Sequence, residues 1–121
     1  MPTKPEDFFA KYFKQSEFAC HCGCGNSTMS ALLLDRLDAL RAELNTPIRI
    51  SSGFRCLKHN RSVGSSDGSQ HPKGTAADIM VKGYTPSQIY AILEEKFPTS
   101  CGIGKYKTFV HFDVRAKRAR W

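Results

Sequence analysis

Two histidine–aspartate pairs are the residues of this sequence best suited to chemistry. His71 and Asp78 lie around the start of an apolar run, and His111 and Asp113 lie two residues apart near the C-terminus. Imidazole and carboxylate groups are the usual ligands of a catalytic zinc ion, which takes three protein ligands and leaves one position open. His71, Asp78 and His111 make such a set. Zinc lowers the pKa of the water it binds from about 16 to about 7 and polarises a substrate carbonyl.

Two predicted strands and one loop must position these pairs. The apolar run 76–81 predicts a buried strand that contains Asp78, and the segment 109–114 predicts a strand that contains the second pair. Because successive side chains of a strand point to opposite faces, the second pair shares one face. His71 is too far from Asp78 for one helical face, so the loop has to fold back toward the strand.

The remaining pattern predicts helices and short strands around this pair of strands. Three helices are predicted: one over 5–14, one through 33–44, and one from Thr85 to Phe97 with Pro86 in its first turn. Ser27 or Ser30 is expected to cap the second helix, and residues 45–47 are expected to end it. Short strands are predicted at 48–50 and 102–104. Residues 57–74 show no periodicity and predict a long loop, a feature that is usually functional. This order predicts an α+β fold in which a small antiparallel sheet carries the zinc site, with two to three flanking helices.

The composition indicates one globular domain over residues 1–121. Of these residues 40% are hydrophobic and 24% are charged, which is ordinary for a single core of this length. No apolar run approaches the roughly 20 residues that a membrane-spanning helix needs, so no span is expected. The polar N-terminus lacks the apolar segment of a signal peptide.

The net charge of +7 suits an anionic partner. Nucleic acid, anionic lipid and a cell-wall polymer are the candidate classes. Four of the positive charges lie within residues 115–121, where a basic chain end is often only solvated. No nucleic-acid-binding motif accompanies the charge, so we expect no nucleic-acid partner.

The cysteines leave several possibilities open. The chain has five of them, Cys20, Cys22, Cys24, Cys56 and Cys101. An odd number leaves at least one thiol outside any disulfide scheme. The C-x-C-x-C run is tighter than a C-x-x-C zinc knuckle, yet alternate thiolates could hold a soft metal, with Cys56 or His59 as distant partners. The other possibilities are a glycine-rich loop with small buried side chains, or one disulfide to Cys56 or Cys101. None of the five has the surroundings of a catalytic nucleophile.

The segment 69–78 reads Ser-x-His-x-x-Gly-x-Ala-x-Asp and is followed by an apolar His-x-Asp strand. Together they resemble the zinc D-alanyl-D-alanine carboxypeptidases and peptidoglycan endopeptidases, which belong with the lysostaphin-type peptidases and the hedgehog signalling domain. The segment 52–55 is similar to the family's Ser-Gly-x-Arg. The resemblance extends from about Phe18 to Trp121 and is greatest to a compact subgroup of bacteriophages and prophages.

The resemblance implies roles for five residues. His71, Asp78 and His111 would hold one zinc ion. Arg55 would offer its guanidinium to a substrate carboxylate or carbonyl, for which its planar fork is suited. Ser69 would hydrogen-bond the substrate backbone.

The general base is where this chain departs from the family pattern. Several relatives have Glu or Asp three residues before the last histidine, where this chain has Thr108, and others have a histidine two residues before it, where this chain has Phe109. Asp113 is the remaining carboxylate on the face of His111. It would act either as the catalytic base or as the group that orients a ligand histidine.

The activity that the resemblance implies is zinc-dependent hydrolysis of amide bonds in the peptide stem or cross-bridge of peptidoglycan. The first interpretation is an endolysin-like L-Ala–D-Glu or D,D-endopeptidase. The alternatives are a D-Ala-D-Ala carboxypeptidase and a non-catalytic zinc-binding domain of the hedgehog type. We expect a monomer that is made in the bacterial cytoplasm and acts in the periplasm or cell wall, after phage or prophage release or dedicated export.

Overall fold

A five-stranded sheet forms the centre of the computed structural model, which describes residues 10–21, 29–64 and 70–121. Its strand order is β1-β2-β4-β3-β5. All neighbouring strands are antiparallel except β3 and β5, which run parallel. The predicted α+β fold with a small, mostly antiparallel sheet is therefore confirmed. The strands are β1 (Ile48–Ser52), β2 (Ala76–Val81), β3 (Gly102–Lys105), β4 (Val110–Asp113) and β5 (Ala119–Arg120).

Three α-helices accompany the sheet, α1 (Ala31–Leu44), α2 (Leu57–Ser62) and α3 (Pro86–Lys96). The Ser30 hydroxyl accepts a hydrogen bond from the backbone N–H of Leu33, so Ser30 caps α1 as predicted, and Ser27 lies outside the described residues. Asn45 ends α1 in the left-handed conformation with φ of 50°. Thr85 and Gln88 form the capping box that begins α3.

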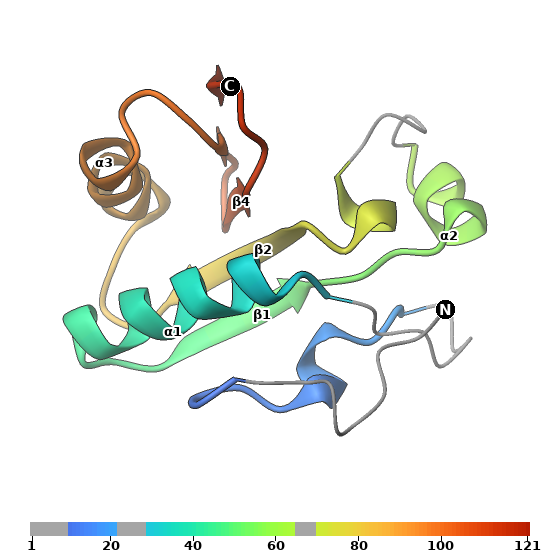
Figure 1. Ribbon diagram of the computed structural model, residues 1–121, viewed down its shortest axis with the longest axis horizontal. Helices are drawn as coiled ribbons and strands as arrows, with labels where there is room; N and C mark the ends of the chain where they lie inside the picture. The colour runs from blue at the N-terminus through green and yellow to red at the C-terminus, as the bar shows by residue number, and fades with distance from the viewer. Residues whose placement is uncertain (1–9, 22–28, 65–69) are drawn as a thin grey trace.

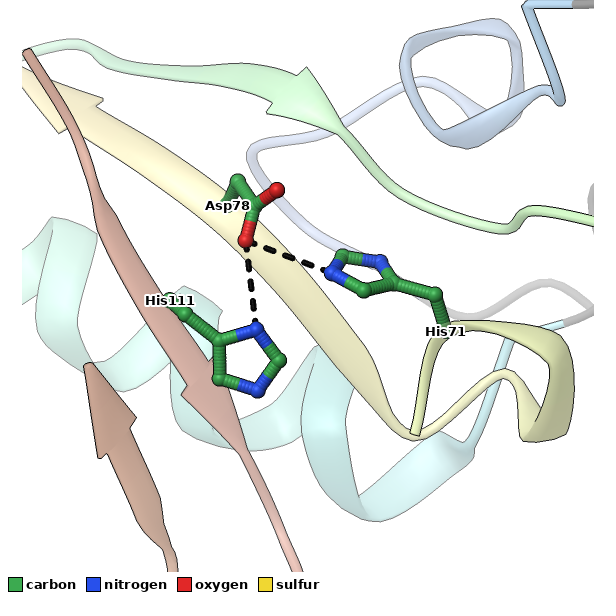
Figure 2. A group of neighbouring side chains, drawn as sticks. All are labelled: His71, Asp78 and His111. Atoms are coloured by element: carbon green, nitrogen blue, oxygen red, sulfur yellow. Dashed lines mark ion pairs between the residues drawn. The ribbon is translucent and has the colours of Figure 1, made fainter. Parts of the chain in front are cut away.

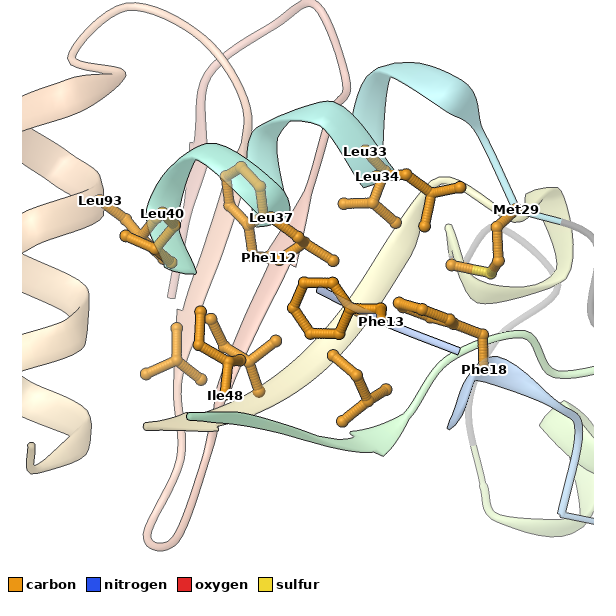
Figure 3. Packing of buried hydrophobic residues seen from close by; sticks show 14 of the residues in the cluster. Phe13, Phe18, Met29, Leu33, Leu34, Leu37, Leu40, Ile48, Leu93 and Phe112 are labelled. Carbon is orange, nitrogen blue, oxygen red and sulfur yellow. The ribbon is translucent and has the colours of Figure 1, made fainter. Parts of the chain in front are cut away.

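The core lies between α1, α3 and the sheet (Figures 1 and 3). Helix α1 directs its apolar stripe inward, and Phe112 of β4 and Leu93 of α3 meet it there. The buried residues of the stripe are Leu33, Leu34, Leu37 and Leu40. This packing fixes β2 and β4, the two strands that carry the predicted metal ligands. Among the described residues, no helix has both the length and the apolar character needed to cross a membrane.

The predicted helix over 5–14 is wrong for the part of it that the structure describes. Residues 10–14 are not helical, residues 5–9 lie outside the described range, and a 3₁₀-helix, η2, follows at Gln15–Phe18. The backbone N–H groups of Lys11 and Tyr12 donate to the Asp38 carboxylate of α1, at 2.7 and 3.0 Å, in place of intrahelical bonds. Within the described residues, this segment is therefore tied to α1 by backbone hydrogen bonds, and Phe13 is buried in the core.

The predicted loop over 57–74 contains two short helices that the sequence pattern did not indicate. These are α2 and the 3₁₀-helix η3 (His71–Lys73), and residues 65–69 between them lie outside the described range. Cys56 precedes α2 and caps it, because its sulfur accepts a hydrogen bond from the His59 backbone N–H. Cysteine is not among the usual capping residues, which explains why the start of α2 was missed.

Candidate metal centre

His71, Asp78 and His111 come together from three separate elements (Figure 2). Asp78 Oδ1 lies 3.3 Å from His71 Nε2 and 3.3 Å from His111 Nδ1. One ligand atom from each residue lies within 4.8 Å of the other two. All three side chains are buried. The structure therefore brings together the three residues that the sequence analysis selected as metal ligands.

Strand pairing and one turn produce this convergence. Asp78 and His111 are direct partners in the antiparallel pairing of β2 with β4. His71 begins η3, which has a proline in its first turn and ends at Gly74 with φ of 72°. Glycine adopts the left-handed conformation easily, and this conformation at Gly74 turns the chain back toward β2. The fold-back of the loop that the sequence analysis required is achieved by this turn.

His71 is held by a backbone carbonyl. Its Nδ1 lies 2.7 Å from the carbonyl oxygen of Gly53, and its side chain is fully buried. A carbonyl oxygen only accepts hydrogen bonds, so Nδ1 donates and carries the proton. Nε2 is thereby turned toward Asp78 Oδ1 and is the ring nitrogen that a metal at this position would use.

His111 is held by a carboxylate and presents the opposite nitrogen. Its Nε2 donates to Asp113 Oδ2 at 2.7 Å, and its Nδ1 faces Asp78. Asp113 is fully buried and also accepts hydrogen bonds from the backbone N–H groups of Gly102 and Arg115, at 3.0 and 3.1 Å. The Arg115 guanidinium donates to both of its oxygens. Both oxygens of Asp113 are thus occupied by donors.

These contacts keep both aspartates ionised. Burial alone would raise the pKa of Asp78, but the imidazoles of His111 and His71 lower it to about 2. Burial would likewise raise the pKa of Asp113, but the donors on His111 and Arg115 hold it far below its usual range. Burial tends to lower the pKa of His111, and its contacts with Asp113 and Asp78 outweigh this effect, so the pKa is raised. Asp78 is therefore a carboxylate at neutral pH, the form that could ligate a metal, and Asp113 is a weak proton acceptor.

The donor set fits a zinc ion. Asp78 Oδ1 is buried between two imidazole nitrogens and has no hydrogen-bond partner among the described residues. Burying a polar atom without a partner is costly, and a cation between the three groups would remove that cost. Two nitrogens and one carboxylate oxygen are the donors of catalytic zinc sites that keep a position open.

Arg55 lies next to this centre with a donor available. Its backbone N–H donates to the His71 carbonyl at 3.5 Å. Its Nε is buried and has no hydrogen-bond partner among the residues that the structure describes. Burial lowers the pKa of the guanidinium, and the negative charge of Asp78 opposes this effect. Arg55 therefore has an unused hydrogen-bond donor close to the three ligands.

The other positions raised by the family pattern have different surroundings. Ser69 lies outside the described residues, so its proposed contact with substrate stays a prediction. Thr108 is exposed in the connection between β3 and β4. Phe109 stacks on Tyr106 with ring centroids 4.6 Å apart. Neither Thr108 nor Phe109 offers a carboxylate or imidazole that would replace the groups found in relatives.

The aromatic ring of Trp121 lies beside His111, and Trp121 was not among the predicted site residues. The Trp121 ring lies 4.9 Å from the His111 ring, centroid to centroid, and its Nε1 donates to the Tyr106 hydroxyl at 2.8 Å. Trp121 reaches this position because β5 pairs with β3. A Cβ atom on Gly104 would overlap the Trp121 indole. The Gly-x-Gly of β3 was the available signal, since glycine often marks close approach.

The comparison with protein families agrees with this geometry. The Peptidase M15 family model matches residues 11–113, a range that includes Arg55 and the three candidate ligands. No curated protein matches the chain significantly. The matched range covers most of the 121 residues. The chain therefore belongs to the Peptidase M15 family, the zinc peptidases of the D-Ala-D-Ala carboxypeptidase type.

Proposed function

We propose that this protein is a zinc-dependent peptidoglycan hydrolase that cuts an amide bond of the wall peptide. The observation that carries the proposal is the convergence of His71 Nε2, Asp78 Oδ1 and His111 Nδ1. Three protein ligands of this type leave one coordination position open for chemistry. Zinc, when bound there, activates water and polarises the carbonyl of the scissile amide.

The chain's own residues prepare the site for the ion. The Gly53 carbonyl and the Asp113 carboxylate hold the ring protons of His71 and His111 on the sides that face away from Asp78. Each imidazole therefore turns its other ring nitrogen toward Asp78, where a bound cation would take the place of a proton. Because Asp113 is fully buried and both of its oxygens accept hydrogen bonds, we assign it to positioning His111 rather than to accepting a proton.

Arg55 is assigned to the substrate. Its buried Nε without a partner among the described residues supports this role, because a substrate oxygen would satisfy it. A guanidinium donates through a rigid planar fork to a carboxylate or to a carbonyl whose negative charge grows during attack. Arg55 thus positions the substrate and stabilises the oxyanion.

The specific activity that we propose is an endopeptidase of the endolysin type, acting on an L-Ala–D-Glu or a D,D bond. Removing a terminal D-alanine would not open the wall, so release of a phage requires an internal cut. The net charge of +7 favours retention on an anionic wall, although bulk charge adds rate rather than specificity. A monomer acting in the periplasm or cell wall, after release or export, fits this role.

Mass spectrometry of muropeptides tests which bond is cut. Purified peptidoglycan is digested with the zinc-loaded protein, and the products are compared with those of an Asp78→Ala variant. New peptide termini at an internal amide bond are the expected result. Release of D-alanine alone would establish the carboxypeptidase instead. Zinc binding without any new product would establish the non-catalytic domain, an alternative that the absence of an acid at position 108 favours.

A further inference from the structure

We propose that Cys20 and Cys56 are two ligands of a second metal ion, a structural zinc that is separate from the His71–Asp78–His111 centre. The two residues are 36 positions apart in the sequence, yet their Sγ atoms lie 3.8 Å from each other. A disulfide bond would place them about 2.05 Å apart. Two sulfurs on one tetrahedral zinc, each at about 2.3 Å from the ion, are about 3.8 Å apart.

Each of the two sulfurs accepts a hydrogen bond from a backbone N–H group. The Cys56 N–H donates to Cys20 Sγ at 3.5 Å, and the His59 N–H donates to Cys56 Sγ at 3.5 Å. The thiolate is the form that ligates a metal. Cys20 is buried and Cys56 is half-buried, so an ion between them would be shielded from water on one side.

Two histidines lie beside the sulfurs. His21 follows Cys20 directly and His59 lies one helical turn after Cys56, and their rings are 6.4 Å apart between centroids. His21 is exposed and His59 is half-buried, so solvent reaches both side chains. Sulfur and imidazole together make the closed four-ligand sets of structural zinc sites. Among the described residues, only His71, Asp78 and His111 already have their ligand atoms gathered, so the proposed site would form when the His21 and His59 side chains rotate toward the sulfur pair.

Such an ion would hold the segment that supports the catalytic centre. The Phe54 N–H donates to the Phe18 carbonyl at 2.9 Å, and a Cβ atom on Gly53 would collide with the Phe18 backbone. Gly53 in turn supplies the carbonyl that orients His71. Arg55 directly precedes Cys56. A metal cross-link between Cys20 and Cys56 would therefore stabilise the position of both Arg55 and the Gly53 carbonyl.

Cobalt spectroscopy separates the two sites. The His71–Asp78–His111 centre contains no sulfur, so a sulfur-to-cobalt charge-transfer band in the near ultraviolet reports the second site alone. The reduced protein is stripped of metal and titrated with Co²⁺. The zinc content of a zinc-loaded sample is measured in parallel by inductively coupled plasma mass spectrometry. We expect two zinc ions per chain and a charge-transfer band in the wild-type protein.

Matched variants assign the band. Cys20→Ser and Cys56→Ser should each lose it and retain one zinc, whereas His71→Ala should keep the band and lose the other zinc. Cys101→Ser is the control, because Cys101 is buried elsewhere beside the Arg36 guanidinium, at 3.0 Å, and should retain both ions. Cys22 and Cys24, which lie outside the described residues, stay unchanged in every variant.

Three results would overturn the proposal. They are one zinc per chain without a band in the wild-type protein, a band that survives both cysteine substitutions, and a Cys20–Cys56 disulfide detected by mass under non-reducing conditions. The first and third are measured on the unaltered protein, so they hold even when a cysteine variant fails to fold. Wall hydrolysis that persists while the band is absent would reject this second site and leave the proposed function intact.

Discussion

Single residues determine which nitrogen each histidine offers to the metal centre. His71 is oriented by a backbone carbonyl, which no side-chain substitution removes, whereas His111 is oriented by the carboxylate of Asp113. The His111 contact is therefore the one that mutagenesis tests directly. Strand alternation predicts Asp113 on the face of His111, but it does not distinguish a base from a positioning residue. That distinction depends on hydrogen bonds from the Gly102 backbone N–H, in a neighbouring strand, and from the Arg115 side chain, two residues further along.

Asp113→Asn should weaken zinc binding more than it slows turnover. The amide retains the shape of the carboxylate but loses the charge that holds the His111 ring proton. We expect zinc affinity to fall about 10- to 100-fold, with activity largely recovered at saturating zinc. Zinc titrations followed by kcat measurements across pH check this. A fall in kcat of about 100- to 10,000-fold at saturating zinc, with loss of the acidic limb, would instead identify Asp113 as the base.

Arg55→Lys should lose most of the activity while zinc content stays unchanged. Lysine keeps the positive charge but not the planar fork with its fixed donors. Kinetics on wall fragments, together with zinc analysis, measure both effects. Arg49→Lys is the matched control, since Arg49 is exposed on β1 and should behave as the wild type. Near wild-type kinetics for the Arg55 variant would show that Arg55 only supports the fold.

At the scale of secondary structure, the close pairing of β3 with β4 positions His111 and Asp113. Gly102 and Gly104 are the direct partners of Asp113 and His111 in this pairing. A Cβ atom on Gly102 would overlap the Asp113 carboxylate. Strand β3 therefore needs glycine at position 102, because a larger residue would displace the Asp113 carboxylate from its hydrogen bond with His111.

Gly102→Ala should displace Asp113 and weaken zinc binding together with stability. The added methyl group takes the space of the carboxylate, and shifts of this kind cost typically about 1–3 kcal/mol. Chemical unfolding and zinc titration measure the two effects. Ile103→Val is the control on the same strand, expected to cost about 0.5–1.5 kcal/mol without changing zinc affinity. Unchanged zinc affinity in the Gly102 variant would show that Asp113 does not depend on this clearance.

The elements that the sequence predicted correctly are those with clear local signals. Helices α1 and α3 have apolar periodicity together with Ser30 and Thr85 caps, and β2 and β4 are apolar runs of strand length. Helix α2 was missed because a cysteine sulfur caps it. Strand β5 was missed because it has two residues and forms only through pairing with β3. Neither the cysteine cap of α2 nor the pairing of β5 with β3 produces a periodic pattern of apolar residues in the sequence.

The whole molecule brings its ligands from distant parts of the chain, and the ion would tie them together. His71 and His111 are 40 positions apart and belong to different elements. The three candidate ligands could be selected from the sequence because each is recognisable by its residue type and its local motif. The Gly53 carbonyl and the Trp121 ring beside them were not, because only the folded chain places them there.

Zinc should stabilise the folded protein, and chelation should lower its melting temperature. A ligand present at about 1,000 times its Kd adds about 4 kcal/mol to the free energy of unfolding. Scanning calorimetry with and without a chelator measures the shift, which should amount to several degrees or more for a chain of this length. Asp78→Ala should show a smaller zinc-dependent shift than the wild type. An equal shift in both proteins would mean that zinc binds elsewhere only.

Zinc-dependent release of peptides from purified peptidoglycan tests the central claim most directly. Metal-free protein should release none, and added zinc should restore release in the wild type but not in Asp78→Asn or His111→Ala at any zinc concentration. Asp35→Asn, which alters an exposed aspartate of α1, should match the wild type. Peptide release by the metal-free protein, or wild-type release by either ligand variant, would contradict a zinc centre at His71, Asp78 and His111.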